Sequence, residues 1–395
     1  MKLLFIFGTR PEAIKLAPVI KEALENQEIM QVVTCLTAQH RQMLDQVIDL
    51  FEIPVDFDLN IMTTNQSIFD ITIKALSLLR NTLERERPDI VITQGDTTTT
   101  FAASLASFYL KTPVAHIEAG LRTNNKFHPF PEEINRRLTT HIADLHFAPT
   151  VKARLNLLNE GISDERICVT GNTVIDALKL ILDEQNNTGR MRELEKILLQ
   201  KTGLPCFGNR IILVTSHRRE NYGKGFENIC YALKEISYSN KDIDIIFPVH
   251  LNPNVRMPVY NILGNIKNIH LIEPLEYTEF IYLMNKSYMI LTDSGGIQEE
   301  APALNKPVMV MREVTERPEA IEAGIAKLVG TDVSTIVNET HKLLDNRNEY
   351  ELMSKAHNPY GDGTASKKII KILSSYIFNE AHHQLLSKKN EKVLV

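Results

Sequence analysis

The feature of this sequence that most constrains its fold is the alternation of short, unbroken apolar segments with longer amphipathic ones. Unbroken runs of apolar and β-branched residues are typical of strands buried on both faces, as in parallel sheets covered by helices. Strands are predicted on this basis at residues 3–7, 31–36, 90–93, 113–117, 145–148, 167–170, 211–215, 243–249, 268–272, 288–292, 307–311 and 326–329. The helices predicted between them include residues 12–26, 39–51, 69–85, 97–109 and 226–237. So many strands exceed one ordinary doubly wound sheet, and the sequence therefore predicts an α/β protein with two such sheets.

The length of 395 residues fits two domains. A predicted strand ends near residue 170 and a glycine turn follows, so the expected domains are residues 1–170 and 171–363. The polar end of the chain is expected to form a helix that frays into a tail. Ligands are expected at the carboxyl ends of the strands, in a cleft where the two domains face each other.

Composition excludes several classes of function. A net charge of −5 argues against a nucleic-acid-binding protein, which needs a clustered excess of Lys and Arg. No apolar run is long enough for a transmembrane helix or a signal peptide. The four cysteines, Cys35, Cys168, Cys206 and Cys230, form no CxxC pair, which predicts a reduced, cytoplasmic protein with packing cysteines and no metal site. Neither a P-loop nor a GxGxxG motif is present, so no nucleotide cofactor of those kinds is expected.

Three carboxylates follow successive predicted strands of the first half. Glu118 directly ends an apolar strand, where it suits neither a core nor a helix cap. Asp96 either caps the next helix or faces the cleft, and the spacing leaves both interpretations open. Glu132 lies in a first helical turn, which the helix dipole favours on structural grounds alone. Together the three suggest proton transfer more than any one of them does.

Cationic and glycine-rich strand ends suggest anion sites. Arg10 and Lys15 flank a helix start with a capping box, which is either an anion site or only a well-capped helix. In the second half, His217 is followed by two arginines at a strand end. Ser294, Gly295 and Gly296 expose backbone N–H groups at a helix start, although glycine pairs also mark ordinary turns, and Glu300 is suited to a ribose diol. These features favour a nucleotide-linked substrate that undergoes proton or group transfer.

Ten motifs, in order along residues 1 to about 375, resemble the non-hydrolysing UDP-N-acetylglucosamine 2-epimerases. They are FGTRPEAIK (7–15), AQHRQMLDQV (38–47), QGDTTTT (94–100), HIEAGLRT (116–123), PFPEEINR (129–136), TGNTVIDAL (170–178), TSHRREN (215–221), PVHLNPNV (248–255), TDSGGIQEEAP (292–302) and TERPEA (315–320).

The resemblance implies a glycosyltransferase-B-like architecture of two Rossmann-like domains, with a C-terminal helix at about 364–385 crossing back to the first. It implies reversible conversion of UDP-GlcNAc to UDP-ManNAc by anti elimination of UDP, a 2-acetamidoglucal intermediate and re-addition of UDP. The product would supply surface polysaccharide synthesis. A homodimer, activation by a second UDP-GlcNAc and the absence of a cofactor are also implied.

The resemblance further implies roles for individual residues. The acid/base and histidine positions are Asp96, Glu118, Glu132 and His217. The UDP-contact positions are Arg10, Lys15, Phe280, Ser294, Gly295, Gly296, Glu300 and Arg317. The activating site corresponds to Gln39, Gln42, Arg218 and His250.

Departures from the family pattern are few. Asn124 stands where relatives usually carry glycine, His128 where they carry serine, and Asn65 where those with the activating site often carry arginine. The alternatives are a hydrolysing epimerase that releases UDP and ManNAc, a glycosyltransferase and a non-catalytic nucleotide-sugar sensor. The PEE and HIEAGLRT motifs as written speak against the hydrolysing epimerase, the three carboxylates against a glycosyltransferase, and the intact acid/base residues against a sensor.

Overall fold

The computed structural model describes residues 1–38, 41–63, 66–187 and 189–376. The chain forms two compact units, each built around one sheet. The first unit comprises Met1–Ala177 and the chain from Tyr360 onward, and the second comprises Leu178–Pro359. Within the described residues, no helix combines the length and hydropathy needed to cross a membrane.

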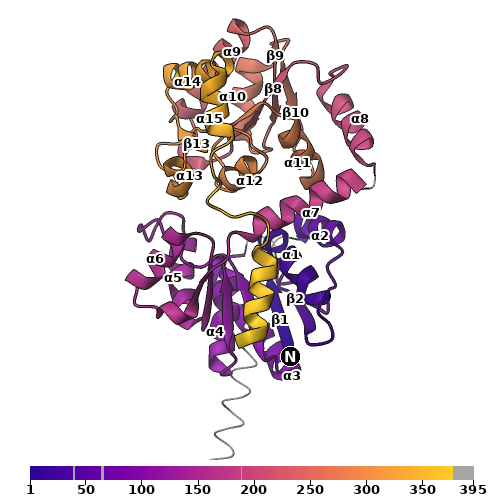
Figure 1. Ribbon diagram of the computed structural model, residues 1–395, viewed down its shortest axis with the longest axis vertical. Helices are drawn as coiled ribbons and strands as arrows, with labels where there is room; N and C mark the ends of the chain where they lie inside the picture. The colour runs from indigo at the N-terminus through magenta and orange to yellow at the C-terminus, as the bar shows by residue number, and fades with distance from the viewer. Residues whose placement is uncertain (39–40, 64–65, 188, 377–395) are drawn as a thin grey trace, which may run out of the picture. The chain divides into compact units, whose positions relative to one another are not determined.

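The first unit contains a seven-stranded parallel sheet of order β3-β2-β1-β4-β5-β6-β7 (Figure 1). Its strands are β1 (Lys2–Phe7), β2 (Gln31–Leu36), β3 (Phe57–Asp58), β4 (Ile90–Gln94), β5 (Val114–Ile117), β6 (Leu145–Ala148) and β7 (Ile167–Val169). Its helices are α1 (Arg10–Leu24), α2 (Arg41–Phe51), α3 (Ile68–Glu86), α4 (Thr98–Tyr109), α5 (Glu132–Ile142), α6 (Val151–Asn159) and the start of α7 (Thr173–Asn187). Residues 365–376 form a further helix, yellow in Figure 1.

The second unit repeats this plan with a six-stranded parallel sheet of order β10-β9-β8-β11-β12-β13. Its strands are β8 (Arg210–Thr215), β9 (Ile243–Pro248), β10 (Ile269–Ile272), β11 (Met289–Thr292), β12 (Val308–Val310) and β13 (Ala326–Leu328). Its helices are α8 (Met191–Thr202), α9 (Lys224–Ser239), α10 (Pro253–Leu263), α11 (Tyr277–Lys286), α12 (Ile297–Ala303), α13 (Pro318–Glu322), α14 (Val333–Asp345) and α15 (Arg347–Ser354). The predicted fold class, two parallel doubly wound sheets, is confirmed. Strand β3 was not predicted, because its two residues form no apolar run.

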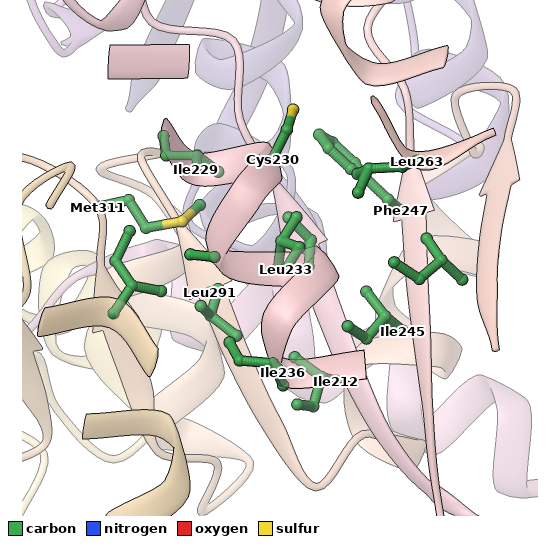
Figure 2. Close-up of a cluster of buried hydrophobic side chains, with 14 of the residues drawn as sticks. Ile212, Ile229, Cys230, Leu233, Ile236, Ile245, Phe247, Leu263, Leu291 and Met311 are labelled. Carbon is green, nitrogen blue, oxygen red and sulfur yellow. The ribbon is translucent and has the colours of Figure 1, made fainter. Parts of the chain in front are cut away.

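The core of the second unit shows why these strands are unbroken apolar runs. Figure 2 shows side chains of α9, among them Leu233 and Ile236, packed against the sheet. Ile212 of β8 and Ile245 of β9 are fully buried beneath this helix. Helices cover both faces of such a sheet, so successive residues of a strand are buried and alternation disappears.

The cysteines follow the expectation only in part. All four are free thiols. Cys35 and Cys230 are buried, and burial raises the pKa of each thiol to about 12. Cys206 is exposed, so the prediction of a packing role is wrong for this residue, which lies in the irregular segment between α8 and β8.

Two segments of the first unit meet at a pair of glycines. The N–H of Asn172 donates to the carbonyl oxygen of Tyr360 at 2.7 Å, which brings Gly171 against Gly361. Both glycines have positive φ, 94° and 110°. Asp176 of α7 then accepts from the N–H and hydroxyl of Ser366 at 2.8 and 2.6 Å and so caps the helix at 365–376.

Replacing Gly171 with alanine should destabilise the protein by about 2–4 kcal/mol. A Cβ at this position would lie 3.1 Å from the Tyr360 carbonyl oxygen and 3.3 Å from the Gly361 Cα, in addition to the positive φ. Gly161 is the matched control, because its φ of 86° is similar and nothing lies within 4 Å of its Cβ position. Gly161→Ala should therefore cost only about 1 kcal/mol in urea unfolding, and equal losses in the two variants would contradict the contact argument.

Candidate active site

A cavity of about 280 Å³ lies at the carboxyl ends of β1, β4 and β5 in the first unit. Strand order reverses between β1 and β4, and this is the position where open α/β sheets bind ligands. The lining residues are Thr9, Pro11, Glu12, Lys15, Gln94, Gly95, Asp96, Thr97, Glu118 and Glu132. The structure thus brings together the three carboxylates and the lysine that the sequence singled out.

Glu118 is held by three donors. Lys15 Nζ lies 2.5 Å from Oε1, Asn172 Nδ2 donates to the same oxygen at 3.0 Å, and Gln94 Nε2 donates to Oε2. The residue has a φ of 66°, in the left-handed region, and its side chain is only 7% exposed. Gln94 lies in the motif QGDTTTT and Asn172 in TGNTVIDAL, but neither motif predicts that these side chains donate to Glu118.

Asp96 faces the cavity rather than capping α4. Thr97 is the N-cap residue, and its hydroxyl accepts from Thr100 N at 3.2 Å. The Asp96 carboxylate pairs with Arg136, while Asn135 Nδ2 donates to the Asp96 carbonyl oxygen at 3.0 Å. Of the two interpretations of Asp96, the structure supports the one that places it at the site.

Glu132 begins α5, and the neighbouring Glu133 fixes the loop that precedes it. Glu133 is fully buried, and it accepts from the backbone N–H groups of Thr123 and Asn124 at 3.1 and 3.2 Å. Asn124 has a φ of 60°, a conformation that asparagine tolerates better than other non-glycine residues. Its side-chain oxygen accepts from Arg137 at 2.9 Å, so asparagine retains here the backbone conformation that glycine allows.

The start of α1 carries the capping box that the sequence predicts. Glu12 accepts from the N–H groups of Gly8 and Thr9 at 2.9 and 2.8 Å, so these two amides are already paired. The predicted capping box is therefore present, and these two amides are not available to an anion. Within the described residues the Arg10 guanidinium makes no hydrogen bond or ion pair.

His116 on β5 supports the loop that carries Asp96. Its Nε2 lies 2.7 Å from the carbonyl oxygen of Gly95, to which it donates. Burial lowers the pKa of His116 to about 3, against the opposite effect of the Gly95 carbonyl. The imidazole is therefore neutral and acts as a positioning group.

This histidine should make stability depend on pH. His116 binds a proton near pH 6.5 in the unfolded chain and only near pH 3 in the folded chain. The free energy of unfolding is therefore unaffected by this residue above pH 6.5 and decreases as the pH falls toward 3. The slope should approach about 1.4 kcal/mol per pH unit in that window. His116→Gln keeps a donor and cannot titrate, so urea unfolding at several pH values should show a smaller slope. The exposed His128→Gln is the control, and identical slopes for wild type and His116→Gln would refute the assignment.

In the second unit, one buried carboxylate organises the loop that contains His217. Asp293, at the end of β11, is fully buried. It accepts from the N–H groups of His217 and Arg218 at 2.9 Å each, from Ser216 Oγ at 2.7 Å and from Asn221 Nδ2 at 3.2 Å. This joins the loops after β8 and β11, at the point where the strand order of this sheet reverses.

His217 itself is largely exposed, and its Nδ1 lies 3.4 Å from Asp293 Oδ1. Its ring stacks on that of His250, with centroids 5.8 Å apart. His217 and His250 were assigned by resemblance to two different sites, and the structure places their rings in contact.

A buried ion network lies beside this loop. Glu316 is paired with Arg312 at 2.6 Å and with Arg218 at 3.2 Å. Burial alone would raise the pKa of Glu316, but Arg317, Arg312 and Arg218 lower it to about 2. The carboxylate is therefore ionised, and it fixes the guanidinium of Arg218.

The segment before α12 is more constrained than the sequence suggested. The N–H of Ser294 donates to Thr292 Oγ1 at 2.9 Å, so this amide is not available to a phosphate. A Cβ at Gly295 would lie 2.8 Å from Glu316 Oε1, which explains the glycine. Gly296 is the N-cap residue of α12.

The remaining predicted residues are distributed as follows. Glu300 is buried and accepts from the Tyr277 hydroxyl at 2.8 Å, and Arg317 pairs with the buried Glu299. Phe280 lies half-buried on α11. Gln39 and Asn65 lie outside the described residues, and of Gln42 only its place in α2 is described.

The chemistry of these groups is that of acids, bases and cations. Within the described residues, no three His, Cys, Asp or Glu side chains are arranged to hold a metal ion. Carboxylates and a lysine at one sheet edge, with a histidine and arginines at the corresponding edge of the second sheet, define an α/β enzyme built for acid–base chemistry.

Comparison with known proteins identifies the family. The model of the UDP-N-acetylglucosamine 2-epimerase family matches residues 22–374. The UDP-N-acetylglucosamine 2-epimerase of Campylobacter jejuni is 54% identical over 390 residues, covering 96% of this chain and 99% of that protein, and that of Escherichia coli K12 is 53% identical over 375 residues, covering 95% and 99%. The structure of the UDP-GlcNAc 2-epimerase from Neisseria meningitidis bound to UDP-GlcNAc matches with a TM-score of 0.88 at 51% identity, covering 94% of this chain and 99% of that one. The chain therefore belongs to the UDP-N-acetylglucosamine 2-epimerase family.

Proposed function

We propose that this protein interconverts UDP-GlcNAc and UDP-ManNAc by elimination and re-addition of UDP. The observation that carries the proposal is the cavity that joins Lys15, Asp96, Glu118 and Glu132 in a member of this family. The Neisseria meningitidis relative, bound to UDP-GlcNAc, supports the choice of substrate. ManNAc-type sugars for surface polysaccharides are the proposed use of the product.

The first half-reaction breaks two bonds. A carboxylate removes the proton from C2, the C1–C2 double bond of 2-acetamidoglucal forms, and the C1–O bond breaks with its electron pair leaving on UDP. The C2 proton is only weakly acidic, so the base must be positioned as the diphosphate leaves. Arg10, His217, the Ser294 side chain and the backbone N–H groups of Gly295 and Gly296 are the groups proposed to stabilise the leaving charge.

The second half-reaction inverts C2. A different acid delivers a proton to the opposite face of C2, and UDP re-adds at C1. Removal and delivery on opposite faces require two groups, and Asp96, Glu118 and Glu132 all line the cavity. Glu118, with its fixed geometry, is the proposed base, and Asp96 and Glu132 are the candidate acids.

UDP binding is proposed for the second domain, residues 171–363, and acid–base chemistry for the first, residues 1–170 with the C-terminal helix. Phe280, Glu300 and Arg317 would contact UDP. A second, activating UDP-GlcNAc would use Gln39, Gln42, Arg218 and His250, and the protein would act as a homodimer. The contact between His217 and His250 supports adjacent rather than separate sites for the two ligands.

Incubation with UDP-GlcNAc in D2O tests the proposal. The expected result is a mixture of UDP-GlcNAc and UDP-ManNAc, both deuterated at C2, without accumulation of free sugar. Stoichiometric UDP and free ManNAc would instead establish the hydrolysing reaction. Binding without any turnover would establish a nucleotide-sugar sensor.

A further inference from the structure

Glu12 lies under the cavity and joins two of its loops. The residue is 2% exposed and occupies the first turn of α1. Its Oε2 accepts from the N–H groups of Gly8 and Thr9 and from the Thr9 hydroxyl, all at 2.8–2.9 Å. Its Oε1 faces two hydroxyls from the β4–α4 connection, Thr97 Oγ1 at 2.5 Å and Thr100 Oγ1 at 2.9 Å.

If Glu12 were a carboxylate, the two hydroxyl hydrogens of Thr97 and Thr100 would have to serve three close contacts: two to Glu12 Oε1 and one to the Gln94 carbonyl oxygen. Thr100 has a single hydroxyl hydrogen, and its Oγ1 lies 2.7 Å from the carbonyl oxygen of Gln94. A carbonyl oxygen only accepts, so the Thr100 hydrogen belongs to that bond. The Thr97 hydroxyl can donate to Glu12. The 2.9 Å contact between Thr100 Oγ1 and Glu12 Oε1 then has no hydrogen unless Glu12 supplies it.

We infer that Glu12 is a protonated, neutral carboxylic acid in the folded enzyme, with Oε1–H donating to Thr100 Oγ1 and the Thr100 hydroxyl donating to the Gln94 carbonyl. In this arrangement every polar atom of the cluster has a partner. Burial of the side chain raises the pKa of Glu12 and outweighs the lowering by its contacts with Thr97, Gly8, Thr100 and Thr9, so the net shift favours the protonated form that the hydrogen count requires.

A neutral acid here has a use in the proposed reaction. The charged groups that line the same cavity are Lys15, Asp96, Glu118 and Glu132. A further negative charge would oppose binding of an anionic diphosphate and the ionisation of the neighbouring carboxylates. Protonated Glu12 holds the loops after β1 and β4 together without adding that charge, and it is therefore a positioning residue.

Glu12→Gln and Glu12→Ala distinguish the two states of this residue. Glutamine resembles the neutral acid in shape and can donate to Thr100, whereas it is a poor substitute for a carboxylate. Glu133→Gln is the matched control, because Glu133 is equally buried but forms ion pairs with Arg136 and Arg137, which glutamine cannot form. We expect the unfolding equilibrium constant at pH 7 to change by less than about fivefold for Glu12→Gln and by more than about a hundredfold for Glu12→Ala and Glu133→Gln.

Infrared spectroscopy provides a direct readout. The difference spectrum of wild type minus Glu12→Gln should contain the C=O band of a protonated carboxyl group, shifted in D2O. A carboxylate band in its place, or a loss of stability in Glu12→Gln equal to that in Glu12→Ala, would overturn the inference. The kcat for epimerisation should follow the same order, lower in Glu12→Ala than in Glu12→Gln.

Only this kinetic comparison rests on the proposed function. An inactive wild-type protein would contradict epimerisation, and the infrared and unfolding results would still decide the state of Glu12.

Discussion

Replacing Glu118 with glutamine is expected to slow exchange of the C2 proton of UDP-GlcNAc by at least about a thousandfold. Glutamine preserves the size of the side chain, and an amide oxygen in place of Oε1 can still accept from Lys15 and Asn172, but it cannot accept a proton from carbon. The Lys15 ammonium, 2.5 Å from the Glu118 carboxylate, stabilises its ionised form and so prepares it as a base. The measurement is deuterium incorporation at C2 in D2O, followed by NMR.

A binding assay separates loss of chemistry from loss of substrate affinity. If Glu118 is the base, the variant should bind UDP-GlcNAc within about threefold of wild type, because a group that acts in the transition state contributes to kcat. Glu84→Gln on the exposed face of α3 is the control for the substitution itself and should leave exchange unchanged. Exchange at the wild-type rate in Glu118→Gln would move the role of base to Asp96 or Glu132.

The fold and the location of the site were predictable because both follow from periodicity and topology. Strands β2 and β6 have the expected bounds, since each is a short, mostly apolar run that is largely buried. Parallel strands bring their carboxyl ends to one edge of the sheet, so the residues that follow β1, β4 and β5 must lie close together. That is why Lys15 and Glu118 meet although 103 positions separate them.

Their partners were not predictable in the same way. Glu12 resembled an ordinary capping residue, and only the structure shows the Thr97 and Thr100 hydroxyls above it. Asp293 belongs to the motif TDSGGIQEEAP, which gives no sign of its hydrogen-bond partners. Its four donors come from a loop more than seventy positions earlier in the chain. Such contacts depend on side-chain direction and loop conformation, which hydrophobic periodicity does not encode.

Replacing Asp293 with asparagine is expected to destabilise the protein by about 3–4 kcal/mol and to lower kcat by about a hundredfold. The Oδ2 atom accepts from the N–H groups of His217 and Arg218, from Ser216 Oγ and from Asn221 Nδ2, and Oδ1 lies 3.1 Å from the His217 N–H. An amide whose oxygen replaces Oδ2 places its NH2 group against the His217 N–H and removes the negative charge that faces all these donors. The loop that carries His217 would then lose the contacts that fix it, and the His217 imidazole would lose its neighbouring carboxylate.

Urea unfolding, steady-state kinetics and NMR titration of His217 together test this role of Asp293. Asn221→Ala is the matched control, because it removes one donor to Asp293, together with a hydrogen bond to the Met311 carbonyl, and leaves the other three donors to Asp293 in place. It should cost about 1 kcal/mol and less than tenfold in kcat. The pKa of His217 should fall in Asp293→Asn, because an anionic neighbour favours the imidazolium, and should stay unchanged in Asn221→Ala. An unchanged His217 titration in Asp293→Asn, with stability lost, would reduce Asp293 to a purely structural residue.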